Sequence, residues 1–235
     1  MPVATKRSYG DPCGIARALD LVGERWALLV VRELVLGPKR FTDLRTGLPH
    51  LSPDVLAQRL RELEGAGVVQ RRTLPPPAGS RVYELTDWGR ELEPVLLALG
   101  RWGSRAAFPP EPGQLGIDAF VLALETLFDP SAADELSAGY ELRLGEYRFH
   151  ARVSGGRLEL ERGDARRPDA TIAGEPGALS AVLWHGRSLA QALRSGTIAL
   201  DGDRAAAERF LSLFPAPRPA ASAPPGAAPA LAAGR

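Results

Sequence analysis

The sequence predicts an α+β protein in which a mainly helical half precedes a half that mixes strands and helices. Apolar residues recur at helical spacing between residues 11 and 65, and two runs with strand character follow at 68–74 and 81–86. Further alternating runs begin after residue 139, beyond a proline-rich stretch at 107–114. These three observations predict two domains of different composition joined by a short connection.

The proline-rich stretch sets the expected domain boundaries. We expect a first domain over residues 1–108, a linker over 109–114 that its prolines stiffen, and a second domain over 115–214. Residues 215–235 contain 6 Pro and 9 Ala without a periodic apolar face, which predicts a disordered tail.

The composition is that of a globular protein. Hydrophobic residues make up 45% of the chain and charged residues 24%, and no apolar run is long enough to span a bilayer. The N-terminus lacks an apolar signal core and a single Cys excludes an internal disulfide framework, so we expect a cytoplasmic protein that does not enter a membrane. The first 108 residues carry 16 Lys and Arg against 12 Asp and Glu, a net charge of +4, and the remainder carries 13 against 16, or −3. The modest basic excess lies in the first domain.

Two helices open the first domain. Asp11-Pro12 is expected to cap a helix that runs to Val22, with Cys13 in its first turn. A second, more apolar helix is expected over 24–34, and Gly37-Pro38 ends it.

A helix-turn-helix is expected next. Residues 41–47 predict a short helix, 48–51 a brief connection, and 52–65 a second helix that Ser52 caps and Pro53 begins. One narrow apolar stripe along this second helix faces the core, and it consists of Leu56, Leu60 and Leu63.

The opposite face of that second helix, with the two runs that follow it, predicts a winged helix that binds DNA. Gln and Arg side chains on a helix pair with adenine and guanine in a major groove, whereas basic residues on the hairpin contact phosphates or a minor groove. The expected DNA contacts on the helix are Ser52, Pro53, Asp54, Ala57, Gln58 and Arg61, and those on the hairpin are Arg71, Arg72 and Arg81. An ordinary amphipathic helix with a solvated face is the alternative for the helix taken alone.

A last helix of the first domain is expected over 87–105. It has more apolar surface than one small domain readily covers, which indicates self-association. Its apolar residues at helical spacing are Leu92, Val95, Leu96, Leu99 and Trp102.

The ordered set of motifs in the first 105 residues resembles the HxlR-type bacterial transcription regulators, which belong with the MarR-like winged helices. It consists of residues 12–26, Phe41-Thr-Asp-Leu, Leu56-Ala-Gln-Arg-Leu-Arg-Glu-Leu, residues 82–89 and Trp102-Gly103. The resemblance implies a homodimer joined by its first and last helices, which binds a partly palindromic double-stranded DNA operator. Asp54 departs from the family pattern, in which a neutral or basic residue is frequent.

The second domain is expected to contain a helix at 117–128, strands at 140–144, 147–153, 157–161 and 170–173, helices at 176–185 and 188–194, a strand at 197–200 and a helix at 204–214. This order, with motifs at 168–174, 177–183 and 196–203, resembles the sterol-carrier-protein-like α+β fold. The resemblance implies a fold that encloses apolar ligands.

A pocket for a small hydrophobic effector is therefore one expectation for the second domain, and a solid core is the alternative. Either would be built from Phe120, Leu124, Phe128, Leu179, Leu183, Trp184, Phe210 and Phe214.

No constellation of residues indicates an enzyme, a metal site or a cofactor. The three His are scattered, there is no second Cys, and no Gly-rich loop with a Lys joins a strand to a helix. Cys13 is a possible redox residue, because a helix N-terminus favours the thiolate, but a small, partly buried hydrophobe is the alternative. We expect a sequence-specific transcription regulator that a hydrophobic effector can control. The alternative is a hydrophobic-ligand carrier in which the winged helix serves only dimerisation.

Overall fold

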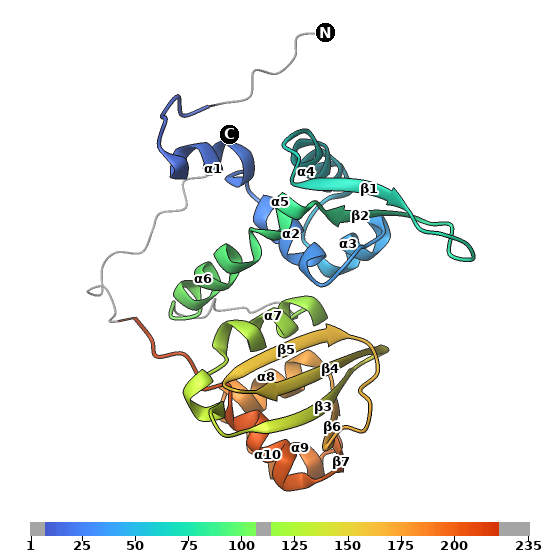
Figure 1. Cartoon of the computed structure of the whole chain (residues 1–235), viewed down its shortest axis with the longest axis vertical. Coiled ribbons are helices and arrows are strands. Elements are labelled where there is room, and N and C mark those ends of the chain that lie inside the picture. The colour runs from blue at the N-terminus through green and yellow to red at the C-terminus, as the bar shows by residue number, and fades with distance from the viewer. Residues whose placement is uncertain (1–7, 107–113, 221–235) are drawn as a thin grey trace.

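The computed structural model describes residues 8–106 and 114–220, and it confirms a mixed α+β architecture with a helical N-terminal domain and a C-terminal domain built on a sheet (Figure 1). The N-terminal domain contains α1 (Gly14–Val22), α2 (Ala27–Val35), α3 (Phe41–Gly47), α4 (Pro53–Gly65), β1 (Val69–Thr73), β2 (Arg81–Leu85), α5 (Asp87–Arg90) and α6 (Glu93–Gly103). The expected linker at 109–114 lies outside the described residues except for Gln114, and so do residues 221–235 of the expected tail. No helix in the described ranges is long and apolar enough to cross a membrane.

The core of the N-terminal domain confirms the apolar stripe expected on α4. Its three leucines are 0–1% exposed and belong to the same cluster as Val30, Val31 and Leu34 of α2. The Ser52 hydroxyl accepts a hydrogen bond from the backbone N–H of Val55 at 3.4 Å, so the predicted cap fixes where α4 begins.

Two helix starts differ from expectation. Cys13 is the N-cap of α1 and does not lie in its first turn, because its ψ of 134° is not helical. The Asp11 carboxylate accepts the Cys13 N–H at 2.9 Å. Helix α2 begins at Ala27, three residues later than expected, since Trp26 adopts a left-handed φ of 78°. Such a residue cannot continue a right-handed helix.

The single helix expected over 87–105 is wrong, because the chain forms α5 and α6 there. Pro94 lies in the first turn of α6 and has no N–H to donate to the preceding turn, so a continuous helix would lose that hydrogen bond. Thr86 caps α5 by accepting the Gly89 N–H at 3.0 Å.

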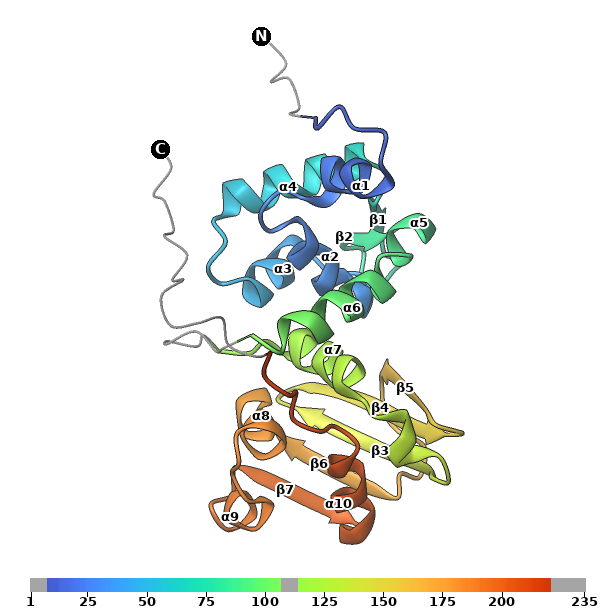
Figure 2. The ribbon, with the colours of Figure 1, turned by 90° about the vertical axis from the view of Figure 1, so that its left-hand side faces the viewer.

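The C-terminal domain is a five-stranded sheet with its helices on one face (Figures 1 and 2). The strand order is β5-β4-β3-β6-β7, in which only β3 and β6 run parallel. The elements are α7 (Ile117–Leu127), the 3₁₀ turn η1 (Pro130–Ala133), β3 (Ser137–Leu144), β4 (Tyr147–Ser154), β5 (Arg157–Arg162), β6 (Ala170–Gly174), α8 (Pro176–Trp184), α9 (Leu189–Arg194), β7 (Ile198–Gly202) and α10 (Arg204–Ser212). Every expected element is present, and only η1 was not anticipated.

Helix α6 joins the two domains by packing on α7. A Cβ at Gly100 would lie 3.1 Å from the Thr126 side chain, so glycine permits this close approach. Arg101 Nε also donates to the Thr126 carbonyl at 3.1 Å. A second connection is ionic, because Lys39 Nζ lies 2.6 Å from Glu33 Oε2 and 2.7 Å from Asp118 Oδ2.

The α6–α7 contact makes stability depend on pH. Burial, and secondly the nearby Glu93 carboxylate, raise the pKa of Glu125 from 4.5 to about 7. The folded state therefore favours the protonated acid. The stability that this protonation contributes is complete below pH 4.5 and is lost as the pH rises through about 7. We expect Glu125→Gln to flatten the profile and to exceed wild type above that window by about 1–2 kcal/mol in urea unfolding. Exposed Glu135→Gln is the matched control, and an unchanged profile in Glu125→Gln would refute the assignment.

Candidate nucleic-acid interface

Helix α4 presents its polar face to solvent. Asp54, Gln58 and Arg61 are exposed and Ala57 is half-buried, while Ser52 and Pro53 are exposed where the helix begins. Figures 1 and 2 show α4 at the end of the molecule away from the C-terminal domain, so that domain leaves this face uncovered. The residues expected to read bases thus share one accessible surface.

The polar side chains of α4 are linked to one another. Arg61 Nη2 donates to Gln58 Oε1 at 2.6 Å, and Gln58 Nε2 donates to Glu62 Oε1 at 2.7 Å. Glu62 also pairs with Arg59 at 2.5 Å. A base edge must therefore replace existing hydrogen bonds of Gln58 and Arg61. The net free energy of a base contact is the difference between the new hydrogen bonds to the base and the hydrogen bonds within α4 that are lost.

The wing places its basic residues on two faces. In the β1–β2 ladder Arg71 lies opposite Tyr83 and Arg72 lies opposite Val82. Because side chains alternate along a strand, Arg71 and Arg81 share one face of the hairpin and Arg72 lies on the other. The three arginines were predicted as one group. They lie on the same hairpin, but they do not form one patch.

Two wing arginines are held by carboxylates. Arg71 Nε lies 2.7 Å from Glu64 Oε1, and the guanidinium is 5.2 Å from the centroid of the Tyr83 ring. The hydrogen bond with Glu64 raises the pKa of Arg71. Arg72 Nε pairs with Glu84 Oε2 at 2.9 Å. Both arginines are exposed, so these pairs are weak enough for phosphates to replace them.

A hollow of about 730 Å³ lies beside the start of α4. Exposed Arg45 on α3 and His50 in the turn before Ser52 line it, so they stand next to the predicted DNA contacts. Sequence reasoning omitted both residues. The signal was present, since a basic residue in the first helix of a helix-turn-helix faces the same duplex as the second helix.

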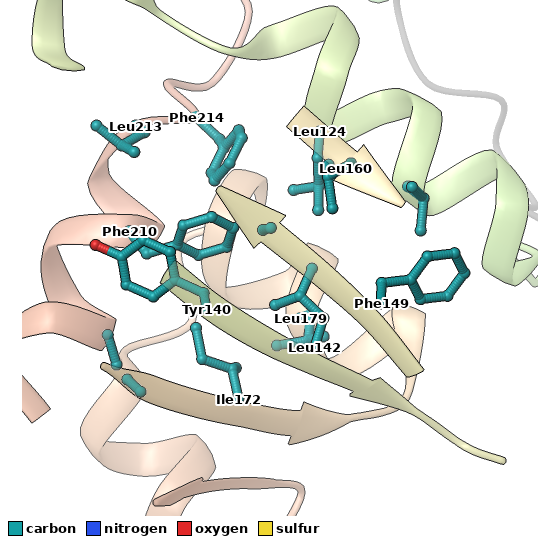
Figure 3. Packing of buried hydrophobic residues seen from close by; sticks show 14 of the residues in the cluster. Leu124, Tyr140, Leu142, Phe149, Leu160, Ile172, Leu179, Phe210, Leu213 and Phe214 are labelled. Carbon is teal, nitrogen blue, oxygen red and sulfur yellow. The ribbon is translucent and has the colours of Figure 1, made fainter. Parts of the chain in front are cut away.

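The eight side chains expected to form a pocket in the C-terminal domain come together in one cluster. Five are 1% exposed and Phe128, Leu183 and Trp184 are partly buried. Figure 3 shows four of the five, which are Leu124, Leu179, Phe210 and Phe214. Their rings are in contact, with centroids 5.8 Å apart for Phe120 and Trp184 and 5.0 Å apart for Phe210 and Phe214. Cys13, the N-cap of α1, is exposed and belongs to the other domain. In the described ranges no group of His, Cys, Asp and Glu could hold a metal ion.

Comparisons with known proteins concern mainly the N-terminal domain. Residues 21–110 match the family model described as HxlR-like helix-turn-helix. The chain is 40% identical over 88 residues to the uncharacterised HTH-type transcriptional regulator YvaP of Bacillus subtilis, covering 37% of this chain and 82% of YvaP. It is 36% identical over 92 residues to the HTH-type transcriptional regulator YodB of the same organism, covering 39% of this chain and 82% of YodB.

Two solved structures match different shares of the chain. The reduced form of YodB from B. subtilis matches with a TM-score of 0.37 at 34% identity, covering 42% of this chain and 98% of YodB. A variant of the sec-alkyl sulfatase PisA1 matches with a TM-score of 0.39 at 21% identity, covering 50% of this chain and 17% of that enzyme.

Proposed function

Since this chain belongs to the HxlR-like helix-turn-helix family of DNA-binding transcription regulators, we propose that α4 is the element with which it reads an operator. The carrying observation is the division of α4 into a buried leucine stripe and an exposed face bearing Gln58 and Arg61. Wing residues Arg71, Arg72 and Arg81 would hold the sugar-phosphate backbone or a minor groove. The alternative, in which the winged helix serves only dimerisation, predicts no specific DNA complex.

We further propose a homodimer. Val95, Leu99 and Trp102 are 52%, 47% and 75% exposed on the free face of α6, and Ile15 and Leu19 are exposed on α1. Figure 1 shows α1 and α6 on one side of the domain, away from the wing. An isologous interface there would present two α4 helices to a partly palindromic operator.

Arg61→Ala is expected to lose about 1–3 kcal/mol of operator binding and to relax preference at one position of each half-site. The reason is that Arg61 would make a bidentate contact with a base. Gel shifts against the DNA around its own gene, with single-base operator variants, measure both effects.

Arg81→Ala is the matched comparison on the wing. It should weaken binding to all sequences alike and reduce the slope of log affinity against log salt by roughly one, as expected for a lost phosphate contact. If Arg61→Ala and Gln58→Ala both leave affinity and preference unchanged, α4 is not the reader.

We propose that the C-terminal domain adopts a sterol-carrier-protein-like fold that admits a small hydrophobic effector. Two buried polar atoms, the Tyr140 hydroxyl and Trp184 Nε1, have no hydrogen-bond partner among the described residues. Both residues belong to or pack against the hydrophobic cluster of this domain. The ring centroids of Tyr140 and Phe210 are 4.5 Å apart. A polar group on an apolar ligand would satisfy them. Calorimetry with fatty acids and sterols tests this proposal, and no binding would leave the domain with a solid core.

Oxidation of Cys13 is a further proposal, because this residue is exposed at the N-cap of α1, the helix that carries Ile15 and Leu19 of the proposed dimer face. With no second Cys in the chain, the product would be a disulfide between subunits or an adduct with a small thiol. Operator binding that responds equally to oxidant in wild type and Cys13→Ser would rule it out.

A further inference from the structure

A cavity of about 440 Å³ lies at the junction of the two domains. The end of α2 and the turn into α3 form one wall, the segment that enters α7 forms another, and Tyr147, Arg162 and Glu175 of the C-terminal domain complete it. A molecule in this cavity would touch both domains at once.

Carboxylates outnumber cations in the lining. The acids are Glu33, Asp43, Asp118 and Glu175, whereas the cations are Lys39 and Arg162. Both cations already have partners, since Lys39 pairs with Glu33 and Asp118, and Arg162 pairs with Asp118. Among the described residues no hydrogen bond or ion pair engages the exposed Glu175 carboxylate. The charge still available to a ligand is therefore negative.

The rest of the lining is apolar or aromatic. Leu36, Leu115 and Ile117 contribute aliphatic surface, and the Tyr147 side chain, 47% exposed, brings its ring to the edge. Tyr147 already accepts a cation at its ring, since the Arg162 guanidinium lies 5.0 Å from its centroid. Such a surface matches a ligand that has an apolar body and a positive charge.

We propose that the junction cavity binds a small organic cation with an apolar or aromatic body, with Glu175 as its counter-charge. Lys39 then provides the route to the DNA-binding surface. Its backbone exchanges hydrogen bonds of 2.9 and 2.8 Å with Tyr83 of β2, and the Tyr83 ring lies against Arg71 of the wing. A ligand that shifts Lys39 relative to Asp118 moves a residue bonded to the wing. This coupling rests on the proposed function, but the binding step does not.

Binding is tested on the full chain without DNA. Isothermal titration with benzyltrimethylammonium and with tetraphenylphosphonium should give saturable binding at one site per chain, while benzoate and benzyl alcohol should not bind. Glu175→Gln should lower the affinity for both cations about two- to fivefold, as expected for a partly exposed charge pair. Leu115→Trp, which fills the cavity, should abolish binding, and exposed Glu135→Gln should change nothing.

Absence of saturable binding by both cations overturns the site, as does equal binding of benzoate or an unaltered affinity in Glu175→Gln. Coupling is measured separately by titrating the operator with and without benzyltrimethylammonium. A shift in operator affinity that Leu115→Trp removes supports the route through Lys39, and bound cation without a shift overturns that route alone. Failure of the chain to bind operator at all would refute the proposed function without touching the calorimetric result.

Discussion

Phe210→Ala is expected to lower the free energy of unfolding of the C-terminal domain by about 3–5 kcal/mol. Phe210 is 1% exposed and its ring packs between those of Tyr140 and Phe214, at centroid distances of 4.5 and 5.0 Å (Figure 3). Removing it leaves a cavity among rigid aromatic neighbours from β3 and from the segment after α10. Such neighbours cannot collapse to fill the space, so the loss should be near the upper part of that range.

The measurement needs a signal from one domain. Trp184 is the only tryptophan after residue 102, so fluorine NMR of 5-fluorotryptophan-labelled protein in urea follows the C-terminal domain through one resonance. Phe210→Leu is the control, because it keeps most of the buried volume and should cost less than about 1.5 kcal/mol. An unchanged midpoint in Phe210→Ala would contradict the packing described for α10.

Lys39→Met is expected to cost about 3 kcal/mol and to uncouple the domains. Lys39 Nζ lies between Glu33 and Asp118, whose side chains are each 2% exposed. Removing the ammonium leaves buried negative charge without its compensation, which is the costly way to break a buried ion pair. Arg32 still pairs with Glu33 at 2.7 Å and Arg162 still pairs with Asp118, so the loss should fall at the lower end of the usual range.

Urea unfolding gives the free energy, and limited proteolysis between residues 106 and 114 reports the domain contact. Arg204→Met is the matched control, since it breaks an exposed pair with Glu208 on α10 and should cost no more than about 0.5 kcal/mol. Equal stabilities for Lys39→Met and Arg204→Met would mean that the ion pairs of Lys39 with Glu33 and Asp118 do not hold the domains together.

Local patterns were sufficient to predict most elements of the fold. Ser52 and Pro53 mark the start of α4 because a cap and a first-turn proline act within one turn of the chain. The break at Pro94 was missed, although proline is a local signal, because the apolar spacing of the surrounding residues continues through it. Trp26 was missed for the opposite reason, since its left-handed backbone has no signature in residue type.

Long-range pairs could not be predicted in this way. Arg71 was expected to contact phosphates or a minor groove, but its partner Glu64 lies on α4 and its ring neighbour Tyr83 lies on β2. Lys39 and Asp118 fall in different domains, so no periodicity relates them. The surface with Gln58 and Arg61 was predicted correctly as exposed, because helical spacing alone puts them opposite the leucines.

Helix α6 has three faces. One packs on α2, one packs on α7 and the third is open to solvent. In the proposed dimer the open face of α6 would pack against α6 of the partner subunit. The same helix would then contact both the partner subunit and the C-terminal domain. Any tilt imposed through α7 would then occur in both subunits, and the two-fold rotation would relate one tilt to the other. The separation of the two α4 helices would change by the combined displacement, against half-sites that B-DNA holds about 34 Å apart. A small rotation at the Gly100 contact would thus be read as a mismatch in operator spacing.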